Sequence, residues 1–265
     1  MIGVFDSGVG GLTVVKEIFK QLPQYQIIYF GDTARLPYGT KGEDFVQKYS
    51  VKITDWLIKN GAKVIVIACN TSSAWASDLL KKRFPNTPIF EMITPAVDDI
   101  NNNHKFSKIG LIGTPGTIKS FAYQKRILKK NPNLKIIAQP CPLLVPLVEE
   151  GKVDGLVVQE TCKEYLSVFD NENIDALILA CTHYPLLKKT IEKIVGKNIK
   201  VINPAENLAK ELKIFLKNNP KIEKQIKKGI DHQFFFSDEP YNFEKIKNLC
   251  FGKKFKKPIK ILTGF

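Results

Sequence analysis

The feature that most constrains the fold of this chain is an internal duplication of short apolar segments. The matching segments are Ile2–Ser7 with Ile109–Thr114, Gln26–Ile28 with Lys135–Ile137, and Val64–Thr71 with Ala176–His183. The members of these pairs are 107, 109 and 112 residues apart. One such match between apolar strands is weak, but three in the same order at nearly the same offset predict two similar lobes.

Short apolar segments alternate with longer amphipathic ones along the chain. The expected strands are Ile2–Phe5, Gln26–Phe30, Lys63–Ala68, Ile89–Glu91, Lys108–Ile112, Lys135–Ala138, Ala176–Ala180, Lys200–Ile202, Gln233–Phe236 and Ile259–Leu262. Helical patterns lie between them, for example over Asp44–Lys59, Ile118–Lys130 and Gly155–Asp170. Strands that are apolar on both faces and joined by helices are typical of βαβ units in parallel sheets. We therefore predict an α/β fold with mainly parallel sheets.

The lobe boundaries are predicted from polar breaks in the pattern. Such breaks occur near Thr94-Pro95 and Asn203-Pro204, where we expect the chain to cross between the lobes. The first lobe is expected to comprise residues 1–95 and 205–265, and the second lobe residues 96–204. In this arrangement the last ~60 residues return to complete the first lobe.

The charge of the chain raises the question of nucleic-acid binding. The formal net charge is +14, and the part from Lys188 onward contains 19 lysines but 8 acidic residues. Basic surfaces of this kind can bind nucleic acid. Only three of the 40 basic residues are arginines, however, and arginine is the residue suited to bidentate phosphate and base contacts. We interpret the lysines as a solvated surface and expect no nucleic-acid partner.

The cysteines and the apolar runs indicate a compartment. No apolar run approaches the ~20 residues that a membrane-spanning helix needs, and Met1–Asp6 enters a strand without a basic leader. An odd number of cysteines without a C-x-x-C pair is typical of free thiols in a reducing compartment. We therefore expect a cytoplasmic protein that makes no membrane contact. The five cysteines are Cys69, Cys141, Cys162, Cys181 and Cys250.

Cys69 and Cys181 are the clearest candidates for chemistry. Each ends an apolar strand, and each is followed by small polar residues and a helical pattern. Ligands bind outside the carboxyl ends of parallel strands, and the N-terminus of a following helix stabilises a thiolate. Free cysteines are usually small core residues, and we assign Cys141, Cys162 and Cys250 that role. The duplicated surroundings of the other two predict sulfurs that meet across one cleft between the lobes.

Two opposed thiols suit the inversion of a stereocentre. One thiolate removes a proton from one face of a carbon, and the other thiol returns a proton to the opposite face. A single cysteine beside a histidine would instead indicate acyl transfer. A redox disulfide is a third interpretation, although cysteine pairs built for that chemistry usually lie close in sequence.

Other polar residues near these strand ends are candidates for proton management. Asp6 follows the first strand, and the glycines of Gly8-x-Gly10-Gly11 permit a tight turn whose N–H groups could hold a carboxylate. His183 lies two residues after Cys181, and Glu149 is a further candidate acid. Because like charge raises a thiol pKa, the two acids could only orient the thiols or accept protons. The glycine pattern departs from a dinucleotide fingerprint, and neither a nucleotide loop nor zinc spacing occurs, so we expect no cofactor and no metal.

Four motifs together resemble those of the glutamate racemases, in the cofactor-independent aspartate/glutamate racemase family. The motifs are Phe5-Asp6-Ser7-Gly8-Val9-Gly10-Gly11-Leu12, Gly31-Asp32-Thr33-Ala34-Arg35-Leu36-Pro37-Tyr38-Gly39, Ala68-Cys69-Asn70-Thr71 and Ala180-Cys181-Thr182-His183-Tyr184-Pro185-Leu186. The resemblance implies a racemase of two pseudo-symmetric α/β lobes that acts without cofactor. Its implied role is to supply D-glutamate for bacterial peptidoglycan, and we expect a homodimer.

The resemblance also implies roles for individual residues. Cys69 and Cys181 correspond to the two acid/base thiols, with Asp6 near the first, and His183 and Glu149 near the second. Adjacent Glu150 leaves a one-residue ambiguity for the last of these. The implied substrate-binding residues are Asp6, Ser7, Tyr38, Gly39, Asn70, Thr71, Thr182 and His183.

The chain departs from the family pattern at Asn203-Pro204, where a small polar pair such as Asp-Ser is expected. Any substrate contact from that strand end is therefore in question. Aspartate racemases of the same family typically carry an acid at the position of His183, which favours glutamate as substrate. Aspartate racemisation and a non-catalytic amino-acid-binding protein stay open as alternatives.

Overall fold

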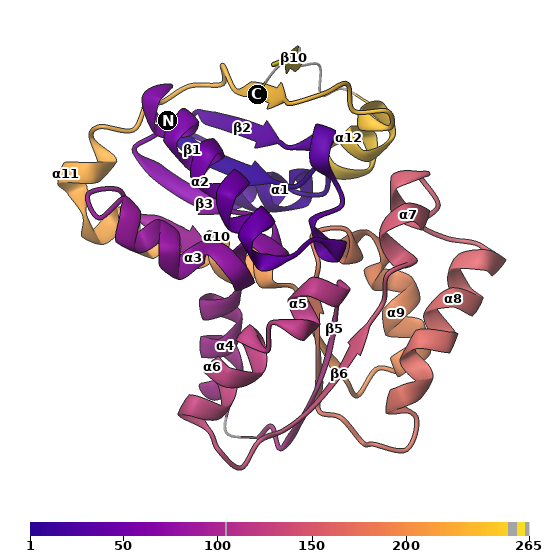
Figure 1. Cartoon of the computed structure of the whole chain (residues 1–265). Helices are drawn as coiled ribbons and strands as arrows, with labels where there is room; N and C mark the ends of the chain where they lie inside the picture. The colour runs from indigo at the N-terminus through magenta and orange to yellow at the C-terminus, as the bar shows by residue number, and fades with distance from the viewer. Residues whose placement is uncertain (104, 254–258, 263–264) are drawn as a thin grey trace.

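The computed structural model consists of two parallel sheets, each flanked by helices (Figure 1). It describes residues 1–103, 105–253, 259–262 and 265. The strands are β1 (Ile2–Asp6), β2 (Ile27–Gly31), β3 (Val64–Ile67), β4 (Ile89–Glu91), β5 (Lys108–Gly113), β6 (Lys135–Pro140), β7 (Ala176–Ala180), β8 (Lys200–Ile202), β9 (Gln233–Phe236) and β10 (Ile259–Ile261). All ten expected strands are therefore present within one or two residues of their predicted bounds.

Helices connect most of the strands. The α-helices are α1 (Leu12–Gln21), α2 (Glu43–Lys59), α3 (Asn70–Arg83), α4 (Ile93–Asn101), α5 (Pro115–Lys119), α6 (Ala122–Lys130), α7 (Leu144–Glu149), α8 (Leu156–Leu166), α9 (Lys188–Val195), α10 (Pro204–Asn218), α11 (Pro220–Glu223) and α12 (Phe243–Phe251). Short 3₁₀ turns cover Thr33–Arg35, Tyr38–Thr40, Ser167–Phe169 and Tyr184–Leu187. Among the described residues, no helix is both long and apolar enough to span a membrane.

The two sheets repeat one pattern, as the duplication predicts. The strand order is β10-β9-β2-β1-β3-β4 in the first sheet and β6-β5-β7-β8 in the second, so β2-β1-β3-β4 corresponds to β6-β5-β7-β8. The register is also repeated, because Ile2 pairs with Val64 where Ile109 pairs with Ala176. The predicted fold class of two similar, mainly parallel α/β lobes is confirmed. We call the part around the six-stranded sheet the first lobe and the part around the four-stranded sheet the second lobe.

Alternate residues of the buried strands pack on opposite faces of each sheet. In β1 and β3, Val4 and Val66 belong to a core that extends into the second lobe, whereas Phe5 and Ile67 pack on the other face. Helices α2 and α3 cover that other face with residues such as Leu57. In the second lobe, α4 and α6 cover one face of the sheet. One apolar core contains residues of both lobes.

The position of the two C-terminal strands bears on the predicted lobe boundaries. The strands β9 and β10 pair beside β2, so the C-terminal part of the chain extends the first sheet and lies along it in Figure 1. The boundaries at residues 95/96 and 204/205 stay a prediction.

The helix expected over Ile118–Lys130 is wrong as a single element, because Phe121 has a φ of 56° and separates α5 from α6. That left-handed backbone conformation interrupts the helical hydrogen bonds.

Candidate active site

Cys69 and Cys181 line the same cavity, which lies between the two lobes. The cavity measures about 30 Å³, and both cysteine side chains are buried beside it. Its lining residues are Ser7, Leu36, Pro37, Tyr38, Gly39, Cys69, Asn70, Thr71, Thr114, Val145, Glu149, Ala180, Cys181, Thr182 and His183. The structure therefore brings together all the predicted substrate-binding residues except Asp6, which lies just behind this lining.

The Cys69 sulfur is held at the N-terminus of α3. Cys69 directly precedes the helix, and its Sγ accepts a hydrogen bond from the backbone N–H of Ser72 at 3.5 Å. The thiol donates to the Ser7 hydroxyl oxygen at 3.7 Å. Burial, followed by the charge of Asp6, raises the pKa of Cys69 to about 11, although these hydrogen bonds oppose the shift. Cys69 is therefore a thiol at neutral pH in the absence of substrate.

The Cys181 sulfur is held by an imidazole instead. A 3₁₀ turn, Tyr184–Leu187, separates β7 from helix α9, and the Cys181 sulfur lies 3.7 Å from Nδ1 of His183. Nε2 of the same ring lies 3.1 Å from Oε1 of Glu149. Burial lowers the pKa of His183, but the contacts with Cys181 and Glu149 outweigh it and raise this pKa to about 10. A protonated imidazole stabilises negative charge on the adjacent sulfur.

Asp6 lies at the contact between the two lobes. Its Oδ2 accepts a hydrogen bond from the Gly8 N–H at 3.0 Å, and its Oδ1 accepts one from the Thr182 hydroxyl at 3.4 Å. Burial raises the pKa of Asp6, while the charge of His183 and the N–H groups of the glycine turn oppose the shift. The carboxylate that the glycine turn holds is therefore that of Asp6. Asp6 affects Cys69 through its charge, but it also contacts the strand end that carries Cys181.

Two glycines allow the lobes to approach closely at the site. A Cβ atom on Gly10 would lie 2.5 Å from Cε1 of His183 and from the Thr182 hydroxyl. A Cβ atom on Gly39 would lie 2.6 Å from the Cβ of Thr114. Both distances are far below van der Waals contact, so a larger residue at either position would push the lobes apart.

Tyr38 is held in the cavity wall by a buried network. Its hydroxyl donates to Oδ2 of the fully buried Asp32, whose Oδ1 accepts hydrogen bonds from Arg35 and Ser237 at 2.6 Å each. Ser237 follows β9, so the C-terminal part of the chain supports the segment that carries Tyr38 and Gly39. This network was not predicted from the sequence, although Asp32 lies in one of the four motifs.

Two threonines of the second lobe, Thr114 and Thr117, were not predicted from the sequence. Thr114 lines the cavity, and its hydroxyl lies 2.9 Å from that of Thr71 and 2.9 Å from that of Thr117. The hydroxyls of Thr71 and Thr117 are 3.1 Å apart, which closes a triangle of hydrogen bonds across the lobes. Thr114 follows β5 as Ser7 follows β1, so the duplication itself contained the signal.

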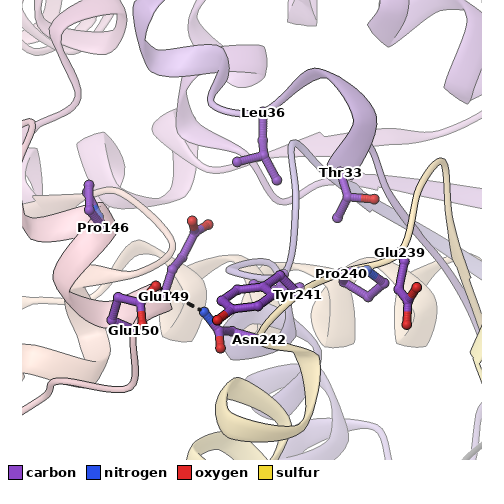
Figure 2. A pocket seen from close by; sticks show the side chains of 10 residues that line it. Thr33, Leu36, Pro146, Glu149, Glu150, Glu239, Pro240, Tyr241 and Asn242 are labelled. Carbon is purple, nitrogen blue, oxygen red and sulfur yellow. Dashed lines mark hydrogen bonds between the residues drawn. The ribbon is translucent and has the colours of Figure 1, made fainter.

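A larger cavity of about 380 Å³ lies at the mouth of the cleft (Figure 2). Leu36 and Glu149 border both this cavity and the smaller one around the thiols. Glu150 accepts a hydrogen bond from Nδ2 of Asn242 at 3.5 Å, drawn as the dashed line in Figure 2. Of the two adjacent acids, Glu149 is therefore the one that contacts His183.

The remaining sequence predictions concern residues away from the cavity. Asn203 caps α10, with its Oδ1 accepting from the N–H of Ala205 at 3.1 Å. Cys141, Cys162 and Cys250 are buried in the apolar core. Within the described part of the chain, no group of three or more His, Cys, Asp or Glu side chains could hold a metal ion.

Comparison with known proteins fits this geometry. The family model for Asp/Glu/hydantoin racemases matches residues 2–212. The chain belongs to this racemase family. A glutamate racemase of Geobacter metallireducens is 42% identical to it over 253 residues, which cover 96% of this chain and 93% of the relative.

Solved structures of racemases are similar over most of this chain. The crystal structure of a glutamate racemase from Francisella tularensis in complex with D-glutamate has a TM-score of 0.90 and 41% identity, with coverage of 99% of this chain and 97% of that one. An aspartate racemase from Picrophilus torridus has a TM-score of 0.58 and 21% identity over 86% of this chain and 95% of that one. The second likeness shows a shared fold and nothing more.

Proposed function

We propose that this chain interconverts L- and D-glutamate by removing and returning a proton at Cα, without a cofactor. The observation that carries the proposal is that Cys69 and Cys181, at corresponding strand ends of two similar lobes, line one cavity. The similarity to glutamate racemases over 96% of the chain supports glutamate as the substrate.

In the proposed reaction, the thiolate of one cysteine takes the Cα proton of one enantiomer. The resulting carbanion then takes a proton on its opposite face from the thiol of the other cysteine. The two cysteines exchange roles when the reaction runs in the other direction. In the substrate-free protein Cys69 carries its proton, because its pKa is raised to about 11.

Acid and base groups lie near both thiols. His183, held by Glu149 at 3.1 Å, stabilises a thiolate at Cys181 and can exchange a proton with it. The carboxylate of Asp6 opposes a thiolate at Cys69 and can accept its proton as the reaction proceeds. We assign Asp6, His183 and Glu149 these supporting roles.

The substrate is bound by polar groups from both lobes. Ser7, Tyr38, Gly39, Asn70 and Thr71 belong to the first lobe, and Thr182 and His183 face them from the second. We infer that these groups bind the carboxylates and the amino group of the amino acid. A cavity of about 30 Å³ holds no more than a few water molecules, so the lobes must part to admit glutamate.

The test is a circular-dichroism assay of both enantiomers of glutamate and of aspartate, run in parallel. We expect interconversion of D- and L-glutamate and incorporation of one solvent deuterium at Cα in D₂O. Turnover of aspartate in preference to glutamate would favour the alternative substrate. Activity that disappears on dialysis and returns with pyridoxal phosphate or a metal would contradict the proposed chemistry.

The second candidate function is amino-acid binding without catalysis. It would be favoured if neither amino acid were turned over while glutamate still bound, or if turnover did not depend on the two cysteines. The contact of Cys181 with His183, which in turn contacts Glu149, argues for catalysis, because a binding site does not need a thiol beside a proton-exchanging pair.

We further propose that the protein is a cytoplasmic homodimer that supplies D-glutamate for peptidoglycan. The free state of all five cysteines supports a reducing compartment. Light scattering on the purified protein should give twice the monomer mass of 29.9 kDa. A mass of one chain at micromolar concentration would contradict the dimer.

A further inference from the structure

A hydrogen bond between the lobes connects a residue outside the motifs to the cavity. Tyr123 lies on α6 of the second lobe, and its hydroxyl donates to Oδ1 of Asn70 at 2.7 Å. Asn70 directly follows Cys69 and lines the cavity around the thiols. Both side chains are buried, with Tyr123 fully enclosed and Asn70 only 3% exposed. The hydrogen bond is therefore shielded from competing water.

The other end of the Asn70 amide is unsatisfied. Its Nδ2 is buried and has no hydrogen-bond partner in the described part of the chain. A buried donor without a partner costs roughly 1–3 kcal/mol, and a ligand that accepts from it would recover that cost. Among the described residues, Asn70 and Ser72 are two of eight buried side chains with an unpartnered polar atom, and of these eight Asn70 is the one that lines the cavity around the thiols. With Oδ1 engaged by Tyr123, Nδ2 is the free end of this cavity-lining amide.

The direction of the hydrogen bond decides which end of the amide is free. A tyrosine hydroxyl can either donate or accept, and a rotated amide would present Oδ1 to the cavity instead. Burial raises the pKa of Tyr123 well above its usual value, so the hydroxyl keeps its proton and needs an acceptor. Within the described residues, Oδ1 of Asn70 is the acceptor that the hydroxyl contacts. An anionic substrate also favours an N–H group over an oxygen on the cavity side.

Helix α6 is anchored firmly enough to hold Tyr123 in place. One turn further along, Nη1 of Arg126 lies 2.6 Å from Oε1 of the buried Glu91, and its Nη2 lies 3.1 Å from the hydroxyl oxygen of Ser77. Glu91 ends β4 and Ser77 lies on α3, so both partners belong to the first lobe. These contacts dock α6 against the helix that begins at Asn70.

We propose that Tyr123 is a positioning residue, which fixes the Asn70 amide so that Nδ2 donates a hydrogen bond to a carboxylate of the bound amino acid. The choice of an amino-acid carboxylate rests on the proposed function. Tyr123 itself does not line the cavity and does not touch the substrate. Its hydroxyl acts by removing the rotational freedom of the amide and by excluding the orientation that would repel an anion.

The direct test is the substitution Tyr123→Phe, which removes the hydroxyl and keeps the ring. We expect KM for both enantiomers of glutamate to rise by about tenfold, with kcat changed by less than about threefold, because the loss concerns binding rather than proton transfer. The matched control is Tyr25→Phe, which removes a hydroxyl bonded to Glu223 at the opposite end of the first sheet. The control should keep the wild-type KM.

A double-mutant cycle separates positioning from packing. In an Asn70→Ala background, Tyr123→Phe should raise KM no further, because the hydroxyl acts only through the amide. Asn70→Asp keeps an acceptor for Tyr123 but lacks the N–H donor, so it should bind glutamate at least as poorly as Asn70→Ala. Equal effects of Tyr123→Phe in both backgrounds, or wild-type binding by Asn70→Asp, would overturn the inference.

Isothermal calorimetry of D-glutamate binding measures affinity without turnover. It therefore tests the positioning role of Tyr123 separately from the proposed racemase activity. Glutamate that binds to the wild-type chain without turnover, and more weakly to Tyr123→Phe, would support the positioning role while contradicting the racemase activity. An unchanged affinity in a folded Tyr123→Phe variant would overturn the positioning role alone. If the thermal midpoint shows that Tyr123→Phe does not fold, wild-type affinity of Asn70→Asp for D-glutamate would overturn the inference, because the proposed donor would then be dispensable.

Discussion

The two halves of the active site share a backbone plan but differ in how each sulfur is held. Cys69 lies two residues after the end of β3 and Cys181 directly follows β7, and these two strands are paired in the same register within their sheets. Around Cys69, the small residues Asn70-Thr71-Ser72 start helix α3 at once, and a backbone N–H reaches the sulfur. After Cys181, a 3₁₀ turn comes before the helix, and Nδ1 of the His183 ring contacts the sulfur at 3.7 Å.

This difference shows what the duplication provides and what it does not. Parallel strands of equal register bring two thiols to one cavity, which is the geometry that two-faced proton transfer requires. Equal thiols would have equal charge states, whereas the reaction needs one acid and one base at a time. The unlike neighbours, Asp6 near one sulfur and His183 with Glu149 near the other, supply that inequality.

Removal of either thiol should have the largest effect. Cys69→Ser and Cys181→Ser are each expected to lower the racemisation rate by about 10⁴-fold, because a serine hydroxyl is a far weaker acid than a thiol. Polarimetry or circular dichroism gives the rate. Cys250→Ser is the matched control. This cysteine is buried in α12, and its substitution should leave activity unchanged. A single-serine variant with more than a tenth of the wild-type rate would show that its thiol is not essential.

Loss of the histidine should affect the two directions unequally. His183→Asn is expected to lower kcat by about 10²–10³-fold where Cys181 acts as base, and by less in the other direction. Asp6→Asn should give more equal losses, because Asp6 contacts the Cys181 strand end as well as influencing Cys69. Since both free enantiomers have the same energy, kcat/KM must stay equal in the two directions. Equal kcat losses for His183→Asn would mean that the ring only binds substrate.

The pH dependence of stability should report the imidazole specifically. The pKa of His183 is raised to about 10 in the folded protein, above its unfolded value of 6.5. The protonated ring therefore stabilises the fold fully below about pH 6.5, and that contribution disappears as the pH rises to about 10. Urea unfolding of the wild type and His183→Asn should show a stability difference that shrinks over this range. A difference that is constant with pH would contradict a raised pKa.

The smallest predicted effect is a gain in stability from Asp6→Asn. Burial raises the pKa of Asp6, so its ionised form costs folding free energy at every pH above its unfolded value. An amide oxygen can still accept from Gly8, and we expect a stabilisation of about 1 kcal/mol, or about 2–4 °C in Tm, at neutral pH. Scanning calorimetry measures this shift. A lower Tm would mean that the carboxylate contributes more to the fold than its burial costs.

The sequence predicted those features that depend on local pattern. Apolar runs locate the strands, and small polar residues after Cys69 predict the helix that caps its sulfur. The break at Phe121 was missed, because nothing in Ile118–Lys130 marks a left-handed residue in advance. The choice between Glu149 and Glu150 was also beyond the sequence, since it depends on how α7 docks against the loop before α12.

Contacts between distant segments account for the rest of what the sequence could not predict. Ser237 supports Asp32 and Tyr38 from 205 residues away in the chain, and Tyr123 reaches Asn70 across the lobes. Asp32 and Asn70 lie in motifs, but no periodicity or motif identifies Ser237 or Tyr123 as their partner. They become visible only when the two sheets are placed together.

The claim that the thiols act on opposite faces can be tested by a half-reaction. A glutamate analogue with a leaving group at Cβ loses that group after removal of the Cα proton, so elimination needs only one base. Cys69→Ser should process one Cα enantiomer of 3-chloroglutamate, and Cys181→Ser should process the other, as followed by chloride release. Processing of the same enantiomer by both variants would contradict the opposed placement of the two thiols.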